Sequence, residues 1–157
     1  MSKFAYLMLI LMSFNMAACT SVAASSESEV EVKEMWGRPL PASVSNGSFY
    51  LHIVNHSDKD EQLLTVDSEF CPQAEIHNTT IDDKGVMHME MVAGGKLSIP
   101  AHEEIVMKPG GLHLMCLGKT AALEIGDEIS FVFTFAQAGN VTVTAVIRDE
   151  PMEHMDH

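Results

Sequence analysis

Residues 127–136 read DEISFVFTFA and residues 140–148 read NVTVTAVIR, with the turn-forming Ala138-Gly139-Asn140 between them. Both runs consist largely of β-branched and aromatic residues, which are typical of β-strands. Two such runs joined by a short glycine-containing segment predict a pair of strands connected by a turn.

Similar short runs continue toward the N-terminus and are separated by turn-forming segments such as Asp83-Lys84-Gly85 and Pro109-Gly110-Gly111. No stretch after the leader shows a convincing helical period. The pattern therefore predicts an all-β, antiparallel sandwich or barrel of eight or nine strands. The further runs cover residues 29–36, 48–54, 61–66, 74–78, 86–92, 104–108 and 112–117.

The chain has 157 residues, which is enough for one domain with a hydrophobic core. Residues 1–24 resemble a secretory signal, with Lys3, an apolar run at 4–12 and small residues up to Ala24. Two cleavage sites compete, because residues 16–19 (MAAC) resemble a lipobox whose Cys19 would carry a lipid, whereas residues 22–24 (VAA) fit ordinary signal peptidase. Both predict a periplasmic protein, soluble or lipid-anchored, with a domain at 25–148 and a polar tail at 149–157.

The net charge of the chain excludes several classes of binding function. The chain carries 9 Lys and Arg against 22 Asp and Glu, a formal charge of −13. Such an acidic chain is unsuited to binding nucleic acid or anionic lipid headgroups. It also has no recognisable nucleophile–base pair or phosphate-binding loop, so we expect no enzymatic activity.

Histidine and methionine gather between residues 77 and 115, at His77, at Met87, Met89 and Met91, and in the pair His113-x-Met115. Thioether sulfur is a soft neutral donor and imidazole a borderline one. If these side chains converge, the mixture favours copper(I) over zinc, iron, magnesium or calcium.

Strand alternation also offers an ordinary explanation for some of these residues. A methionine stripe on one strand face is more often core packing than a ligand set, and Met87 taken alone is expected to lie in the core. In residues 112–117, alternation directs Leu114 and Cys116 to one face and His113 and Met115 to the other.

Three stretches resemble the bacterial periplasmic copper chaperones of the PCu(A)C family: residues 36–39 (WGRP), 50–55 (YLHIVN), and 74–77 (AEIH) through 108–115 (KPGGLHLM). The resemblance covers residues 30–148 and implies a single cupredoxin-like, Greek-key β-barrel. It places the copper ligands at His77, Met89, His113 and Met115. Family spacing fits Met89 when counted from His77 and Met91 when counted from His113, so Met91 and then Met87 rank behind Met89.

The resemblance further implies an extracytoplasmic metallochaperone that delivers copper(I) to the copper centre of a haem-copper cytochrome c oxidase, together with a thioredoxin-like assembly factor. Two alternatives remain open. A blue-copper electron carrier requires two histidines and a cysteine thiolate, for which Cys116 is the candidate. A copper-sequestering β-sandwich would have no specific acceptor.

The tail and the cysteines add two further predictions. His154, Met155 and His157 form a short His/Met tract that is suited to a weak copper(II) site. Cys71 and Cys116 are expected to form a disulfide in an oxidising compartment, because the lipobox would use Cys19. The alternatives are two free thiols, or Cys116 as a copper ligand.

Overall fold

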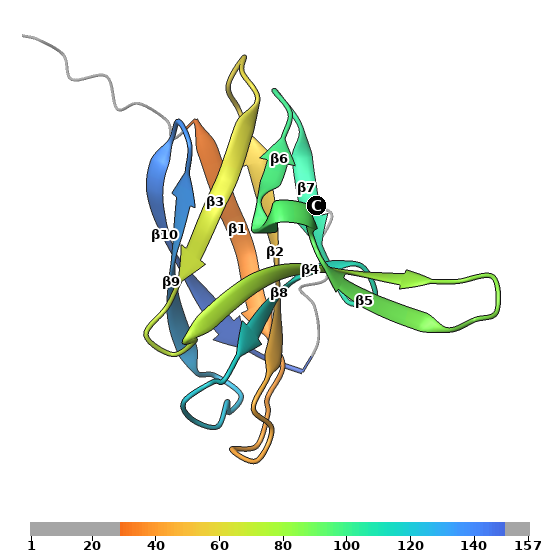
Figure 1. The fold of residues 1–157 in the computed structure, drawn as a ribbon. Helices are drawn as coiled ribbons and strands as arrows, with labels where there is room; N and C mark the ends of the chain where they lie inside the picture. Colours follow the sequence, from red (N-terminus) through yellow and green to blue (C-terminus); the bar gives the residue numbers. More distant parts are fainter. Residues whose placement is uncertain (1–28, 150–157) are drawn as a thin grey trace, which may run out of the picture.

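The computed structural model describes residues 29–149, which form ten strands and a short 3₁₀ turn at Ala93–Gly95. Figure 1 shows a sheet that curls around a core, with the hairpin of β4 and β5 extending away from the body. The strands are β1 (Val30–Gly37), β2 (Gly47–Asn55), β3 (Glu61–Asp67), β4 (Gln73–Ile81), β5 (Met87–Met91), β6 (Leu97–Ile99), β7 (Glu104–Met107), β8 (Leu112–Leu117), β9 (Glu128–Phe135) and β10 (Gly139–Ile147).

The strand order is β5-β4-β8-β2-β1-β10-β9-β3-β6, and β7 also pairs with β2. The prediction of a single-domain, all-β, cupredoxin-like fold is confirmed. The prediction of purely antiparallel pairing is wrong at one place, because β1 and β10 pair in parallel. These strands come from opposite ends of the domain, and alternation along the sequence does not reveal which distant strands meet. The three-residue β6 was not predicted either, because such a short run has too few residues to show a period.

The core follows the alternation of the strands. In β9, Phe131, Phe133 and Phe135 are at most 2% exposed, and the residues between them face outward. Phe49 on β2 meets Phe131 edge to face, with ring centroids 4.8 Å apart. Full burial of a large apolar side chain contributes about 1.5–3 kcal/mol relative to leaving it in water.

Two of the stretches that resemble PCu(A)C proteins stabilise the fold. A Cβ atom on Gly37 would lie 2.9 Å from the ring of Phe49 and 3.1 Å from Ile147, so only glycine fits there. Asn55 is fully buried, and its Nδ2 donates hydrogen bonds to the carbonyl oxygens of Lys59 and Ile99. Gly37 is on β1 and Asn55 on β2, so neither lies on β4, β5 or β8, which carry the predicted copper ligands.

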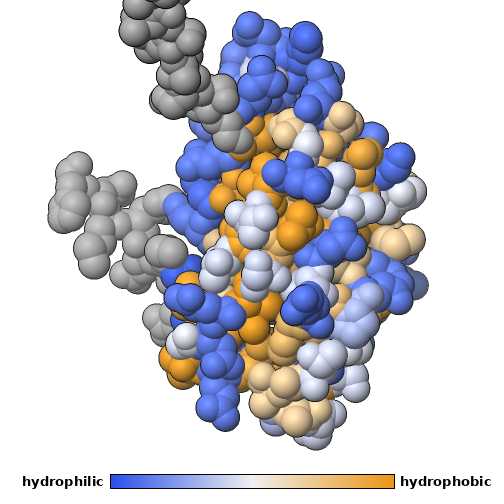
Figure 2. Space-filling view, turned by 90° about the vertical axis from the view of Figure 1, so that its left-hand side faces the viewer, coloured by the Kyte–Doolittle hydropathy of each residue, from blue (hydrophilic) through white to orange (hydrophobic). Residues whose placement is uncertain are grey.

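The face formed around β9 and β10 is partly apolar. Figure 2 shows an apolar strip on this side of the molecule, bordered by hydrophilic side chains. Val141, Val143 and Ile129 pack against the core but are only partly buried. The curled sheet thus leaves some apolar side-chain surface in contact with solvent.

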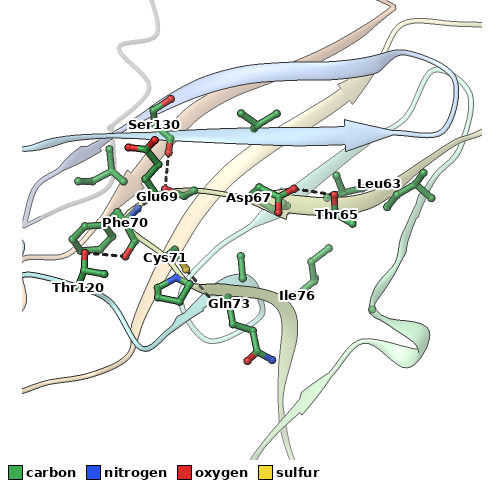
Figure 3. Close-up of a pocket in the computed structure, with 18 of the residues that line it drawn as sticks. Leu63, Thr65, Asp67, Glu69, Phe70, Cys71, Gln73, Ile76, Thr120 and Ser130 are labelled. Carbon is green, nitrogen blue, oxygen red and sulfur yellow. Dashed lines mark hydrogen bonds between the residues drawn. The ribbon is translucent and has the colours of Figure 1, made fainter.

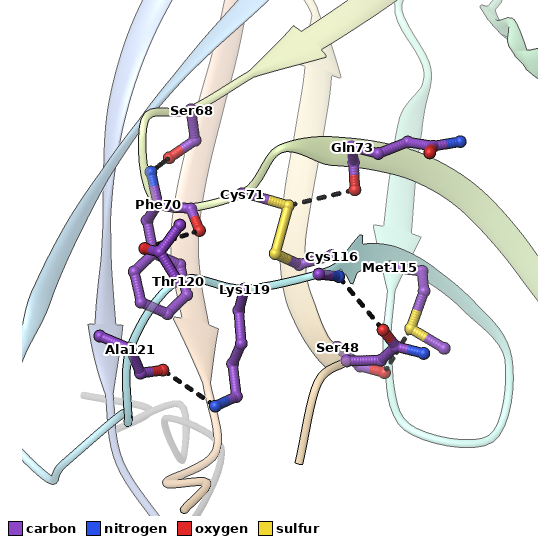
Figure 4. The surroundings of a disulfide bond; sticks show 12 residues. Ser48, Ser68, Phe70, Cys71, Gln73, Met115, Cys116, Lys119, Thr120 and Ala121 are labelled. Carbon is purple, nitrogen blue, oxygen red and sulfur yellow. Dashed lines mark hydrogen bonds between the residues drawn. A yellow bond between two sulfur atoms is a disulfide. The ribbon is translucent and has the colours of Figure 1, made fainter. Parts of the chain in front are cut away.

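Cys71 and Cys116 form a disulfide, with their Cα atoms 5.4 Å apart. Figure 4 shows how the bond links the segment before β4 to β8, beside Met115. The predicted bridge is therefore confirmed, and the two alternatives, free thiols and Cys116 as a copper ligand, are wrong. Closing a loop of 45 residues restricts the unfolded chain by about 4 kcal/mol in the entropic description.

Within residues 29–149, no helix has the length and apolar character needed to cross a bilayer. The predicted leader with Cys19, and the tail ligands His154, Met155 and His157, lie outside the described residues.

Candidate metal centre

The predicted ligands lie on three neighbouring strands, β8, β4 and β5, with β4 in the middle. His77 on β4 is paired with His113 on β8 and with Met91 on β5. Residues that are directly paired across strands project from the same face of a sheet. One row across the three strands therefore carries two imidazoles and a thioether.

The rows on either side belong to the same face. Glu75 pairs with Met115 on one side, and Thr79 pairs with Met89 on the other. We call the part of this surface made by Glu75, His77, Met91, His113 and Met115 the ligand face. The opposite face of the same strands carries Ile76, Leu114 and Cys116, which are buried in the core. The predicted division between His113/Met115 and the core side of β8 is thus confirmed.

His113 is only 3% exposed. Its Nδ1 lies 2.9 Å from the carbonyl oxygen of Gly111. A carbonyl oxygen can only accept a hydrogen bond, so Nδ1 is the donor. In the neutral ring, Nε2 then carries the lone pair that is available to a metal ion.

His77 is oriented in a similar way by a carboxylate. Its Nε2 lies 2.7 Å from Oε2 of Glu75, and Gln73 donates a hydrogen bond to the other oxygen of Glu75. The hydrogen bond from His77 lowers the pKa of Glu75, against an opposing effect of burial. The ionised carboxylate accepts from Nε2–H, which leaves the lone pair of the neutral ring on Nδ1. A carboxylate in this position fixes the ring and makes it a better metal ligand.

The two nitrogens left free by these hydrogen bonds are buried and have no hydrogen-bond partner among the described residues: Nδ1 of His77 and Nε2 of His113. The ring centroids are 6.0 Å apart. A buried polar atom without a partner usually costs free energy, and a metal ion is one way to satisfy it. Arg148 also has unpaired buried nitrogens, but its guanidinium lies over the ring of Trp36.

The methionines of β8 and β5 differ in their surroundings. Met115 is half-buried, and its sulfur lies 3.8 Å from the hydroxyl oxygen of Ser48 on β2. Met89 and Met91 are 47% and 50% exposed, and Met87 is 62% exposed. The expectation that Met87 packs in the core is wrong, because β5 lies in the projecting hairpin and all five of its residues are exposed.

The register bears on which methionine of β5 lies nearest the histidines. Met91 is opposite His77, whereas Met89 is one row further toward the hairpin tip, opposite Thr79. His88 projects from the other face, and its Nε2 lies 3.0 Å from a carboxylate oxygen of Asp82. By position on the sheet, Met91 and Met115 flank the histidine pair.

Two other locations lack this combination of donors. Cys116 is part of the disulfide and has no thiolate to offer, which removes the basis for a blue-copper site.

An open groove of about 1200 Å³ lies between β3, β9 and the start of β4 (Figure 3), where Leu63, Phe70 and Ile76 are among its lining residues. Ile76 and His77 are neighbours in β4, so the groove lies on the face opposite the histidines.

Glu75 and Gly111 are the parts of the site that the sequence did not reveal. Glu75 precedes His77 by two residues in a strand, so a shared face could have been inferred from alternation alone. The contact between Gly111 and His113 depends on how the Pro109-Gly110-Gly111 turn bends. Nothing in the residue types indicates that a carbonyl oxygen of this turn faces the ring.

Comparison with known proteins identifies a family and a relative that this chain resembles in sequence. A sequence model of the LpqE-like family, described as "Putative lipoprotein LpqE-like", matches residues 30–147. An uncharacterized protein of Rickettsia prowazekii, RP573, is 33% identical over 113 residues, which cover 70% of this chain but only 61% of that relative.

Solved structures share the fold. The apo PCuAC domain from PmoF1 has a TM-score of 0.62 and 25% identity, and the match covers 78% of this chain and 95% of that domain. The copper-bound PCuAC domain from PmoF2 has a TM-score of 0.64 and 20% identity, with 78% and 94% covered. The resemblance seen in the sequence thus extends to a PCuAC-like fold. Since the family match takes in all ten strands, the chain belongs to the LpqE-like family.

Proposed function

We propose that this protein binds copper(I) on the ligand face through His77, His113, Met115 and one methionine of β5. The observation that carries this proposal is the pair of buried imidazole nitrogens, on neighbouring strands, that have no hydrogen-bond partner within residues 29–149. Both rings are held by partners on their other nitrogen, as is usual for metal-binding histidines.

The methionine sulfurs determine which metal ion the proposed site favours. Thioethers are soft, uncharged donors that bind copper(I) well and suit zinc, magnesium or calcium poorly. Because Met91 pairs with His77 in register, we propose it as the third donor in place of Met89. Met115, two residues after His113 on the same strand face, is the fourth.

The role we propose is carriage of copper rather than catalysis. Thioethers bind without losing a proton, so copper(I) can be exchanged without acid–base chemistry at the sulfurs. The copper-bound state of the PmoF2 domain, which has the same fold, supports this proposal. We further propose that the protein works in the periplasm, as a lipoprotein anchored through Cys19; the MAAC sequence and the family description support this.

The acceptor we propose is the copper centre of a haem-copper oxidase, with a thioredoxin-like assembly factor, as the resemblance implies. A copper-sequestering protein would bind copper(I) equally well but would not pass it on. Anaerobic mixing of the copper(I)-loaded protein with the isolated copper-binding domain of an oxidase subunit distinguishes the two. Transfer to the oxidase domain is expected, and retention by the loaded protein would favour sequestration.

The ligand set is tested by anaerobic copper(I) titration against a competing chelator. We expect Met115→Leu and Met91→Leu to weaken binding by about tenfold or more, the scale of 1.4 kcal/mol for a lost donor. Met35→Leu, at a core methionine that is 3% exposed, is the matched control and should bind like the parent. Parental affinity in both Met115→Leu and Met91→Leu would contradict the proposed site.

A variant at His113 has to be chosen differently, because the buried ring also contributes to the stability of the fold. At 3% exposure the ring also fills space, so replacing it with alanine would disturb the fold as well as the site. His113→Gln keeps more of the volume, and circular dichroism should precede any titration. X-ray absorption of the parent should show both nitrogen and sulfur around copper.

We propose a second, weaker copper(II) site in the tail at His154, Met155 and His157. Deleting residues 152–157 should remove a copper(II) signal in electron paramagnetic resonance and leave copper(I) affinity unchanged. A copper(II) signal of equal strength after the deletion would contradict a tail site.

A further inference from the structure

The methionines of β5 extend well beyond the histidine pair. Met91, Met89 and Met87 follow one another on the same face, opposite His77, Thr79 and Ile81 on β4. We call these three side chains the methionine row. It begins beside the two histidines and ends near the tip of the projecting hairpin, which Figure 1 shows at a distance from the body of the sheet.

Packing does not account for the methionine row. Its three side chains are 47–62% exposed, and Ile81 beside the outermost one is 67% exposed. Among the described strands, β5 lies at the end of the order and pairs only with β4, so no other described strand covers its outer edge. Thr79, by contrast, is 8% exposed, so the face is most open at the tip and more enclosed toward the histidines.

We propose that the methionine row is a path along which copper(I) moves between the hairpin tip and the histidine pair. This inference rests on the proposed function and adds a route to it. Side chains on one face of a strand recur about every 7 Å, twice the rise per residue. The unbranched, flexible methionine side chain lets neighbouring sulfurs approach the same ion.

Each step is an exchange of ligands. A new copper–sulfur bond forms to the next thioether before the bond to the previous one breaks, and copper remains in the +1 state throughout. No proton or electron is transferred, because a thioether is neutral whether bound or free. The path ends at Met91, from which the ion passes to the free nitrogens of His77 and His113.

The charge around the hairpin favours entry of a cation at its tip. Asp82, Asp83 and Lys84 lie in the turn between β4 and β5, and Asp82 contacts His88. Glu90 lies on the strand face opposite the methionine row, so these charged residues sum to a net negative charge. A net negative charge near the tip attracts copper(I) without the carboxylates being ligands. The sulfur atoms then provide the successive binding positions.

The test separates the rate of loading from the affinity. The probe is the copper(I) complex of bicinchoninate, mixed anaerobically with the full mature chain at concentrations where the loading rate rises in proportion to protein. In the double variant Met87→Leu/Met89→Leu we expect loading to slow by about tenfold, while equilibrium affinity stays within about twofold of the parent. Release to excess chelator should slow by the same factor, since the affinity is unchanged.

Leucine keeps the apolar surface and removes only the sulfur, and Ile81→Leu is the control at the tip. Parental loading and release rates in the double variant would overturn the path while leaving the copper site in place. An affinity loss as large as that of Met91→Leu would make Met87 and Met89 equilibrium ligands and would also overturn it. A parent that binds no copper(I) would instead refute the proposed function.

Discussion

Met107 and Met91 are the same amino acid on two parts of one curled sheet, yet their surroundings are opposite. Met107, at the end of β7, is 2% exposed and pairs with Leu51 inside the core. Met91, at the end of β5, is 50% exposed and pairs with His77. In the core the flexible side chain fills space, whereas on the hairpin it is half exposed and lies opposite His77 in the strand register.

The body of the sheet holds the protein together, whereas the hairpin of β4 and β5 carries side chains that we propose bind copper. β5 has five exposed residues and no core beneath it, so packing does not determine which side chains it carries. Packing restricts the volume and shape of the side chains in the body, whereas packing does not restrict the side chains of β5 in the hairpin. Changes in the body should therefore alter stability, and changes in the hairpin should alter copper binding.

The disulfide should give the largest effect on stability, because it restricts the unfolded chain over 45 residues. Replacing both Cys71 and Cys116 with alanine should lower the free energy of unfolding by about 4 kcal/mol in the entropic description. Urea denaturation of the metal-free protein measures this. The reduced parent is the control and should resemble the double variant; equal stability of oxidised and reduced parent would contradict the prediction.

The two methionines themselves give a matched pair of somewhat smaller effects. Met107→Ala leaves a cavity in the core and should cost about 3 kcal/mol, within the usual range for such truncations. Met91→Ala removes an exposed side chain and should change stability by less than about 0.5 kcal/mol. The same proteins titrated with copper(I) should reverse the order. A Met91→Ala variant as unstable as Met107→Ala would show that the hairpin is part of the packed structure.

The same contrast explains which features could be predicted from the sequence. Strands of the body were recognisable because one face is buried, so that Phe131, Phe133 and Phe135 alternate with the β-branched residues Val132 and Thr134, which are less buried. In the hairpin, alternation still predicted that Met87, Met89 and Met91 share a face, but it could not tell whether that face was buried. Core packing was therefore a reasonable expectation for Met87, and it was wrong because no other layer covers the hairpin.

Contacts between segments that are distant in the sequence could not be predicted from it either. The parallel pairing of β1 with β10 joins residues more than 100 positions apart, such as Trp36 and Val146, and no local pattern specifies it. The burial of His113 and its hydrogen bond to Gly111 likewise depend on how the preceding turn bends. The disulfide was predictable because compartment and cysteine count left few alternatives.

The smallest effect concerns an ion pair on the body of the sheet. Glu104 on β7 accepts a hydrogen bond from Nδ1 of His52 at 2.9 Å and lies 3.5 Å from the ammonium nitrogen of Lys33. These contacts, chiefly the hydrogen bond from His52, hold the pKa of Glu104 below its usual value. A carboxyl group with a lower pKa in the folded state adds stability above its unfolded pKa of about 4.3, and this contribution disappears as the pH falls through the folded pKa.

We therefore expect Glu104→Gln to be less stable than the parent at pH 7 and equally stable near pH 3, as measured by urea denaturation at both values. The difference at pH 7 should be below about 1 kcal/mol, because the side chain of Glu104 is 42% exposed and solvent screens the pair. Copper(I) affinity should not change, since Glu104 lies outside the ligand face. A stability difference that is the same at pH 3 and pH 7 would mean that the glutamate acts by packing rather than by its charge.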